Sequence, residues 1–175
     1  MGELEDGVLS ESFTIVTRSE AETVSIGQAV GASLQARDLI LLSGELGAGK
    51  TRFVEGMTRG IESEAETRSP TFVLVNEYVG RLMLAHCDLY RLSGPEEIGE
   101  LGLDDYLARD AALAVEWPER ARSEFPDEAL EIELDFGEAP DDRVLTATAI
   151  GDAAIRLLTA IRVASETGQH SGSGR

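Results

Sequence analysis

The segment Gly44–Thr51 reads Gly-Glu-Leu-Gly-Ala-Gly-Lys-Thr and fits the phosphate-binding pattern G-x-x-x-x-G-K-[ST]. In such a loop the backbone N–H groups surround the phosphates of a nucleotide, the lysine contacts the β- and γ-phosphates, and the threonine hydroxyl binds Mg²⁺. Glycine suits the loop because it adopts backbone angles that a Cβ would forbid. The pattern predicts a nucleotide site built from Gly44, Leu46, Gly47, Ala48, Gly49, Lys50 and Thr51.

Lys50 is the only lysine among the fifteen Lys and Arg residues of the chain. A compact ammonium suits a point contact with phosphate better than a planar guanidinium does. The apolar run Leu39–Ser43 precedes the loop, and Phe53 and Met57 follow it at helical spacing. Strand, loop and helix in this order are the context that the pattern requires, since the helix N-terminus adds a positive dipole end. This context disfavours a chance match by a glycine-rich turn.

Two acidic residues are candidates for the metal side of the site. Glu116 directly follows the apolar run Ala111–Val115, and Asp88 ends the second strand of a predicted hairpin. In P-loop proteins a carboxylate near the loop helps to hold Mg²⁺. A carboxylate beside an apolar run also needs a partner, because burying it unpaired is costly. The metal role is favoured for Glu116, whereas an ion pair with Arg91 explains Asp88 equally well.

Other reactive side chains are more ambiguous. Thr71 follows Pro70 in a segment expected to face the nucleotide, where it either senses the γ-phosphate or only begins a strand. His86 and Cys87 are favoured as structural residues, because no second His or Cys lies at ligand spacing. Trp117, the only tryptophan, is favoured as a packing anchor over a partner contact or base stacking.

Composition limits the classes of function. The chain has 175 residues, enough for one domain with its own core, and a formal net charge of −18 from 33 acidic and 15 basic residues. This excess disfavours a broad surface for nucleic acid or for anionic membranes. The single cysteine excludes an internal disulfide and fits a reducing compartment. With no signal-peptide pattern and no apolar run of about 18 residues, we expect a cytoplasmic protein without a membrane segment.

Hydrophobic patterning predicts an α/β fold, a P-loop NTPase-like three-layer domain with a mixed, mainly parallel central sheet and a β-hairpin insertion. We expect a disordered acidic leader at 1–11, a single domain at 12–164 and a flexible tail at 165–175. Strands are expected at 12–17, 39–43, 72–79, 82–85, 111–115, 130–136 and 143–150, and helices from the N-cap Ser19 to about Arg37, at 50–59, from 94, near 101–107 and at 152–163.

Four segments occur in an order that carries a family resemblance: Gly44–Thr51, Ser69–Phe72, His86–Leu92 and Glu116–Pro118. With them the chain resembles the bacterial TsaE (YjeE-type) family over roughly 13–136. Many families share the glycine-rich loop, but the downstream segments D-L-Y-R-L and E-W-P are far more specific.

The resemblance implies an ATPase that is required for making threonylcarbamoyladenosine beside the anticodon of tRNA. Such a protein binds ATP or ADP with Mg²⁺, docks on the partner proteins TsaB and TsaD, and hydrolyses ATP to keep that complex cycling. TsaB and TsaD perform the transfer, using threonylcarbamoyl-AMP from a separate synthase, and tRNA is reached only through these partners. The acidic composition fits an accessory protein of this kind.

The resemblance also implies roles for single residues. Lys50 and Thr51 would bind phosphate and metal, and Glu116 would be the second metal ligand. Asp88 would be the acid that is critical for hydrolysis, so that Asp88 and Lys50 form the catalytic pair. Glu20, with Thr23 three residues later, would border the adenine.

Two alternatives remain at this point. One is a binding module that ATP assembles and in which hydrolysis is not required. The other is a small-molecule kinase, which needs an arginine-rich lid over the phosphates. The kinase is disfavoured, because Arg120 and Arg122 form the only close arginine pair.

Overall fold

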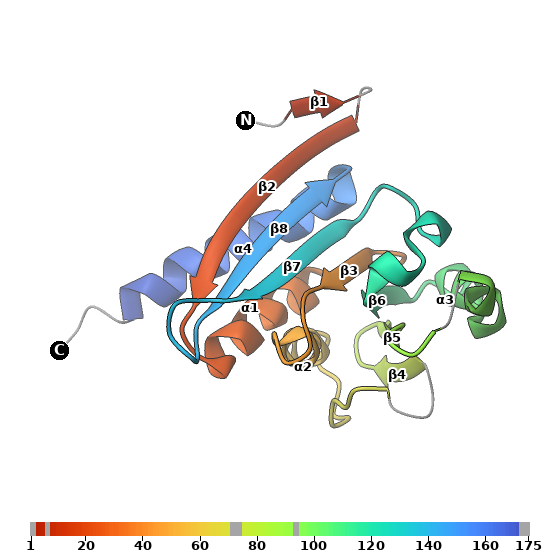
Figure 1. Cartoon of the computed structure of the whole chain (residues 1–175), viewed down its shortest axis with the longest axis horizontal. Helices are drawn as coiled ribbons and strands as arrows, with labels where there is room; N and C mark the ends of the chain where they lie inside the picture. Colours follow the sequence, from red (N-terminus) through yellow and green to blue (C-terminus); the bar gives the residue numbers. More distant parts are fainter. Residues whose placement is uncertain (1–2, 6–7, 71–74, 93–94, 172–175) are drawn as a thin grey trace.

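A computed structural model of the chain describes residues 3–5, 8–70, 75–92 and 95–171. Within these residues a single mixed sheet forms the centre of the molecule (Figure 1). Its eight strands lie in the order β1 (Glu3–Glu5), β2 (Val8–Thr17), β8 (Arg143–Ile150), β7 (Leu130–Phe136), β3 (Leu39–Ser43), β6 (Ala112–Glu116), β5 (Met83–Asp88) and β4 (Val75–Val79).

The parallel pairs lie in the middle of the sheet. Strand β3 pairs in parallel with β7 and β6, and β6 pairs in parallel with β5, whereas the remaining pairs are antiparallel. The central strands β3 and β6 are buried along their length, which is why their sequences are continuous apolar runs. The antiparallel pair β4–β5 confirms the predicted hairpin, although its expected first residues, 72–74, lie outside the described residues.

Helices cover the sheet on both faces and complete three layers. On one face, α1 (Glu20–Ser33), α2 (Lys50–Gly60) and α4 (Asp152–Ser171) share a core with the sheet. On the other face, the 3-10 helix η1 (Pro95–Leu101) and α3 (Leu103–Ala108) pack over β3, β5 and β6. Two short 3-10 helices, η2 (Pro118–Arg120) and η3 (Arg122–Glu124), follow β6. The predicted α/β three-layer fold is confirmed.

Helices α1 and α2 pack backbone to backbone. A Cβ added to Gly27 of α1 would lie 2.1 Å from the carbonyl oxygen of Phe53, and one added to Gly56 of α2 would lie 2.1 Å from that of Val24. No larger residue fits at these contacts without moving a helix. Because α2 begins at Lys50, this packing fixes the N-terminal ends of the two helices relative to each other.

The start of α1 follows its sequence signal and its end does not. Ser19 Oγ accepts a hydrogen bond from Glu22 N at 3.2 Å, which confirms the predicted N-cap. The helix ends at Ser33, earlier than the predicted Arg37. The cause is local: Leu34 leaves the helical conformation, with ψ at 142°.

The structure differs from the sequence expectation at both ends of the chain. The predicted leader 1–11 contains β1 and the first residues of β2: Val8 and Leu9 pair with β1, and Ser10 and Glu11 pair with β8. The predicted tail from Ser165 continues α4 as far as Ser171. Composition indicated disorder in both segments, but pairing with β8 and the preceding helix supply backbone partners. No helix in the described part of the chain combines the length and the apolar character needed to cross a membrane.

Candidate nucleotide-binding site

The glycine-rich loop connects the carboxyl end of β3 to the first turn of α2. Gly44 has φ at +133°, and a Cβ there would lie 2.2 Å from the carbonyl oxygen of Leu134. Gly49 has φ at +108° and is the N-cap of α2. Both positions need glycine, since other residues rarely adopt these angles. The loop therefore presents its backbone at the N-terminal end of a helix, which is favourable for anions.

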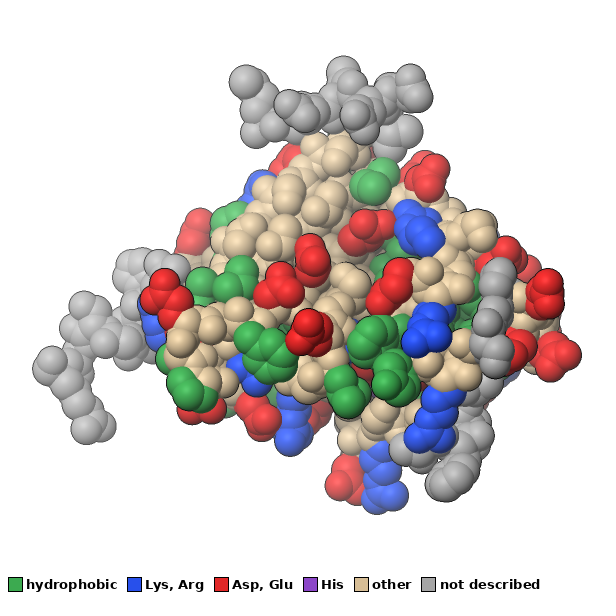
Figure 2. Space-filling view, viewed as in Figure 1, with side chains coloured by type: hydrophobic (Ala, Val, Ile, Leu, Met, Phe, Trp, Pro, Cys, Tyr) green, Lys and Arg blue, Asp and Glu red, His purple; other side chains and the backbone are tan. Residues whose placement is uncertain are grey.

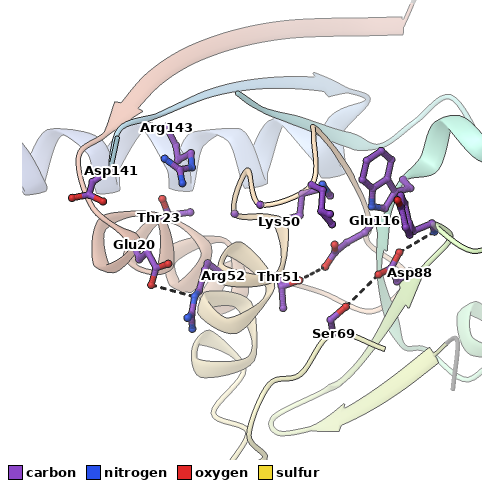
Figure 3. A pocket seen from close by; sticks show the side chains of 15 residues that line it. Glu20, Thr23, Lys50, Thr51, Arg52, Ser69, Asp88, Glu116, Asp141 and Arg143 are labelled. Atoms are coloured by element: carbon purple, nitrogen blue, oxygen red, sulfur yellow. Dashed lines mark hydrogen bonds and ion pairs between the residues drawn. The ribbon is translucent and has the colours of Figure 1, made fainter. Parts of the chain in front are cut away.

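A cavity of about 340 Å³ opens beside the loop, with Lys50 near its middle (Figure 3). On one side of Lys50 lie Glu20 and Thr23, and on the other lie Asp88 and Glu116 (Figure 3). The structure thus brings together, around one cavity, the candidate site residues that the sequence indicated in four separate elements. Of the nominated loop residues, Leu46, Gly47, Gly49, Lys50 and Thr51 line the cavity, whereas Gly44 and the buried Ala48 are not among its lining residues.

Lys50 is held by the loop itself. Its Nζ donates to the carbonyl oxygens of Gly44 at 2.5 Å and Glu45 at 2.9 Å. The Trp117 ring centroid lies 4.2 Å from the same Nζ. Burial lowers the pKa of Lys50, and the nearby carboxylates of Glu116 and Asp88 oppose that shift. The Lys50 ammonium lies at the loop, where a compact cation is suited to contact phosphate.

The two predicted metal ligands meet across the site. Thr51 Oγ1, in the first turn of α2, donates to Glu116 Oε1 at the end of β6 at 3.0 Å. Glu116 is 3% exposed, and His86 Nε2 lies 2.8 Å from the same Oε1. Within the described residues there is no cluster of three or more His, Cys, Asp or Glu that could cage a metal. A hydroxyl beside one carboxylate fits Mg²⁺, which proteins commonly hold through one or two carboxylates together with substrate phosphates.

Asp88 lies next to Glu116, because β5 and β6 pair these two residues. Its Oδ1 accepts from Tyr90 N at 2.9 Å, and its Oδ2 accepts from Ser69 Oγ at 3.3 Å. The carboxylate is thus oriented from two sides while it lines the cavity. Thr71, nominated as a γ-phosphate sensor, lies outside the described residues.

Comparison with known proteins agrees with this geometry. Residues 17–144 match the family model described as "Threonylcarbamoyl adenosine biosynthesis protein TsaE". The chain belongs to the TsaE family. It is 39% identical over 119 residues to the TsaE protein of Treponema pallidum, covering 68% of this chain and 88% of the relative. It is 36% identical over 137 residues to that of Bacillus subtilis, covering 78% and 85%.

A solved structure extends the likeness to the fold. The crystal structure of YdiB from Bacillus subtilis superimposes with a TM-score of 0.74 at 29% sequence identity, covering 93% of this chain and 98% of that one. The family match spans the loop, Asp88 and Glu116. The resemblance inferred from four short segments is therefore confirmed over most of the chain.

The TsaE-family site also contains residues that the sequence did not nominate. Ser69 holds Asp88, and Arg143 Nε, at the start of β8, donates to the carbonyl oxygen of Ala48 in the loop at 3.1 Å. Arg143 and Asp141 line the cavity on the side of Glu20. The signal for Ser69 was its place in the resemblance segment Ser69–Phe72, and no local signal marked Arg143.

The side of the cavity that the resemblance predicts to border adenine begins at Glu20, the first residue of α1. Arg52 Nε lies 3.3 Å from Glu20 Oε2, and Arg52 also pairs with Glu55. Thr23 Oγ1 lies 2.7 Å from Thr17 Oγ1 at the end of β2. Ion pairs and hydroxyl contacts thus connect β2, α1 and α2 at this side of the cavity.

Three residues that the sequence left ambiguous are now located. Trp117 lines the cavity with φ at 59°, and its ring packs against Tyr90 with the centroids 4.9 Å apart. His86 is fully buried. Cys87 is also fully buried, and burial raises the pKa of its thiol to about 12, which opposes a nucleophilic role.

The arginine pair that a kinase lid would need is engaged elsewhere. Arg122 Nη2 lies 2.9 Å from Glu131 Oε1, and Arg122 also donates to two backbone carbonyls. The Arg120 guanidinium lies 5.8 Å from the Tyr90 ring centroid. Neither arginine lines the cavity.

Proposed function

We propose that this protein is a Mg²⁺-dependent ATPase that supports threonylcarbamoylation of the adenosine beside the anticodon in tRNA. Membership of the TsaE family supports the pathway. The observation that carries the ATPase proposal is the contact between Thr51 and Glu116, 3.0 Å apart, at the helix end of a phosphate-binding loop. A loop that binds only an anion has no need of a carboxylate beside its threonine.

The chain's own residues divide the work. The loop N–H groups and Lys50 bind the phosphates of ATP, and Thr51 with Glu116 holds the metal. Bound Mg²⁺ would neutralise charge on the phosphate oxygens during phosphoryl transfer. Asp88, oriented by Ser69 and Tyr90 N, orients the attacking water.

The adenosine half of ATP is proposed to lie against Glu20 and Thr23. These residues line the cavity on the opposite side of Lys50 from the two acids (Figure 3). Arg52 holds the Glu20 carboxylate, and the α1–α2 backbone contact holds Glu20 relative to the loop. In this arrangement ATP would lie across the cavity, with its base at Glu20 and Thr23 and its γ-phosphate near Asp88 and Glu116.

The proposed partners are TsaB and TsaD, on which the protein would act as an accessory ATPase rather than as the transferase. Acidic side chains are spread over the face seen in Figure 2, with basic ones set among them. A net charge of −18 opposes direct binding of a polyanion such as tRNA. RNA is therefore expected to reach the reaction through the partners, and the threonylcarbamoyl-AMP synthase to act upstream.

Reconstitution tests the proposal directly. The protein is combined with TsaB, TsaD, the synthase, tRNA, threonine, bicarbonate and ATP, and ATP hydrolysis and tRNA modification are measured together. We expect the chain to add Mg²⁺-dependent hydrolysis and to sustain repeated rounds of modification. Equal modification over many turnovers without the chain would overturn the proposal. Full modification with a variant that binds ATP but does not hydrolyse it would instead favour the ATP-gated binding module.

A further inference from the structure

His86 is a buried polar residue with a single described hydrogen bond. It lies in β5, is fully buried, and places Nε2 2.8 Å from Glu116 Oε1. Thr51 Oγ1 donates to the same oxygen at 3.0 Å. Three elements, β5, α2 and β6, therefore meet at one carboxylate oxygen.

The contact identifies the proton on the ring. An ionised carboxylate only accepts hydrogen bonds, so Nε2 carries the hydrogen. Nδ1 is buried and has no hydrogen-bond partner among the residues described. The neutral tautomer with hydrogen on Nε2 leaves Nδ1 as a bare acceptor. The other neutral tautomer would bury an Nδ1–H group that has no acceptor among the residues described.

Packing alone does not account for a histidine at this position. A buried polar atom without a partner costs about 1–3 kcal/mol, whereas an apolar side chain of similar size avoids that cost. The core around this strand is apolar, with Leu84 and Ala85 beside it fully buried. The polar ring therefore needs an explanation other than filling space, and its one hydrogen bond ends on Glu116.

The two donors leave the rest of the metal side accessible. Both contact Oε1, so that Glu116 Oε2 has no hydrogen-bond donor among the described residues. Thr51 gives its hydroxyl hydrogen to Oε1, which leaves the lone pairs of Oγ1 for a cation. Without His86, the Glu116 carboxylate would be held by a single hydrogen bond from Thr51. Thr51 is itself proposed to contact the metal.

We propose that His86 is a positioning residue that fixes the Glu116 carboxylate for Mg²⁺. It does so by donating Nε2–H to Oε1, and it touches neither ATP nor the metal. The inference rests on the proposed Mg²⁺–ATP function and adds to it the residue that orients the ligand. Partners of this kind typically change metal affinity by about 10- to 100-fold when they are removed.

The first test needs neither metal nor turnover. The chain has only two histidines, His86 and His170, so a His170→Gln variant assigns the imidazole ¹⁵N signals. We expect a protonated Nε2 and a bare Nδ1 for His86 in the metal-free protein. A hydrogen on Nδ1 with a bare Nε2 would overturn the proposal, and this measurement does not depend on whether any substituted His86 folds.

The second test is a substitution series at His86. The amide nitrogen of Gln reaches the place of Nε2, that of Asn reaches only the place of Nδ1, and Leu removes the donor. The Mg²⁺ concentration for half-maximal binding of a fluorescent ATP analogue is measured alongside binding without Mg²⁺ and the melting temperature. Leu and Asn should raise the Mg²⁺ requirement by about tenfold or more with little effect on metal-free binding, and Gln should restore most of the loss.

The outcomes separate the two proposals. If the wild-type chain shows no Mg²⁺-dependent nucleotide binding, the proposed function fails. If the wild type shows it and His86→Leu has the same Mg²⁺ requirement, the function stands and the role of His86 is overturned. The role of His86 would also be overturned if all three variants raised the Mg²⁺ requirement equally and in proportion to their loss of melting temperature. His86 would then be a residue of the core without a positioning role.

Discussion

Asp88 and Glu116 occupy paired positions at the ends of the parallel strands β5 and β6. The structure holds the two carboxylates differently. Glu116 is buried and receives its donors from Thr51 and His86, whereas Asp88 is partly exposed and is held by Ser69 and Tyr90 N. Adjacent acids with separate partners are suited to the separate tasks that we propose for them, Glu116 at the metal and Asp88 at the water.

Glu116→Gln should weaken the Mg²⁺ dependence of ATP binding more than nucleotide affinity itself. The amide keeps the size of the side chain but loses the negative charge that a hard cation requires. We expect the Mg²⁺ concentration for half-maximal binding to rise by about tenfold or more. Calorimetric titration of nucleotide with and without Mg²⁺ measures both quantities, and an unchanged Mg²⁺ titration would count against the ligand role.

Asp88→Asn should leave ATP binding nearly intact while reducing hydrolysis by about 10²–10⁴-fold, the usual contribution of a positioned acid or base. The amide still accepts from Tyr90 N but is a poor base. Single-turnover hydrolysis with TsaB and TsaD present gives the rate, and Ser69→Ala serves as a milder control because it removes only one orienting contact. If Asp88→Asn hydrolyses ATP at the wild-type rate, a group other than Asp88 must orient the attacking water.

Lys50→Ala should reduce ATP affinity by about 10- to 100-fold, because a hydrogen bond to a charged group contributes about 1.5–3 kcal/mol. Among the described residues its Nζ contacts loop carbonyls and the Trp117 ring, so the fold should persist. Lys50→Arg is the matched control and should not restore binding, since a planar guanidinium is bulkier than an ammonium. Full affinity in Lys50→Ala, with an unchanged melting temperature, would contradict the assigned role.

Sequence reasoning located the parts of the site that depend on local pattern. The loop required only Gly44–Thr51 and its flanking runs, and Glu116 was found because strand ends beside a P-loop recur as acid positions. Ser69 and Arg143 were missed, because their contacts with Asp88 and Ala48 arise only when distant segments meet in the folded chain. The joint contact of Thr51 and His86 on Glu116 was missed for the same reason.

The fold was predictable to a similar extent. Continuous apolar runs identified the buried parallel strands, and the Ser19 cap identified the start of α1. The ends of the chain were not predictable, since composition cannot report that Ser10 and Glu11 pair with β8. Spacing likewise does not reveal the contact of α1 and α2 through Gly27 and Gly56, although it determines which substitutions the fold tolerates.

Gly56→Ala should destabilise the protein by about 1–3 kcal/mol, the usual cost of overfilling a packed contact. Its new Cβ would lie 2.1 Å from the carbonyl oxygen of Val24, which belongs to the α1 backbone and cannot rotate away. Gly168→Ala in α4 is the control, because a Cβ there meets nothing within 4 Å and alanine favours a helix. Urea unfolding measures the free energy of unfolding of both variants. Equal stability would show that α1 and α2 can move apart without a loss of stability.

Cys87 should be protected in the folded protein and should make stability fall at alkaline pH. Burial raises the pKa of its thiol to about 12 from the ordinary value of 9.0, so between these values the folded state binds more protons than the unfolded state. The contribution of the thiol is therefore fully present below pH 9 and is lost as the pH rises towards 12, by at most about 1.4 kcal/mol for each pH unit.

Two measurements check this prediction for Cys87. A thiol reagent at pH 8 should label the folded chain slowly and the urea-unfolded chain rapidly, since the thiolate is the reactive form and the side chain is fully buried. The wild type should also lose more stability than Cys87→Ala between pH 9 and 11, because alanine has no proton to release. Rapid labelling of the folded chain, or parallel pH profiles for the two proteins, would mean that the thiol is more accessible than its place in β5 indicates.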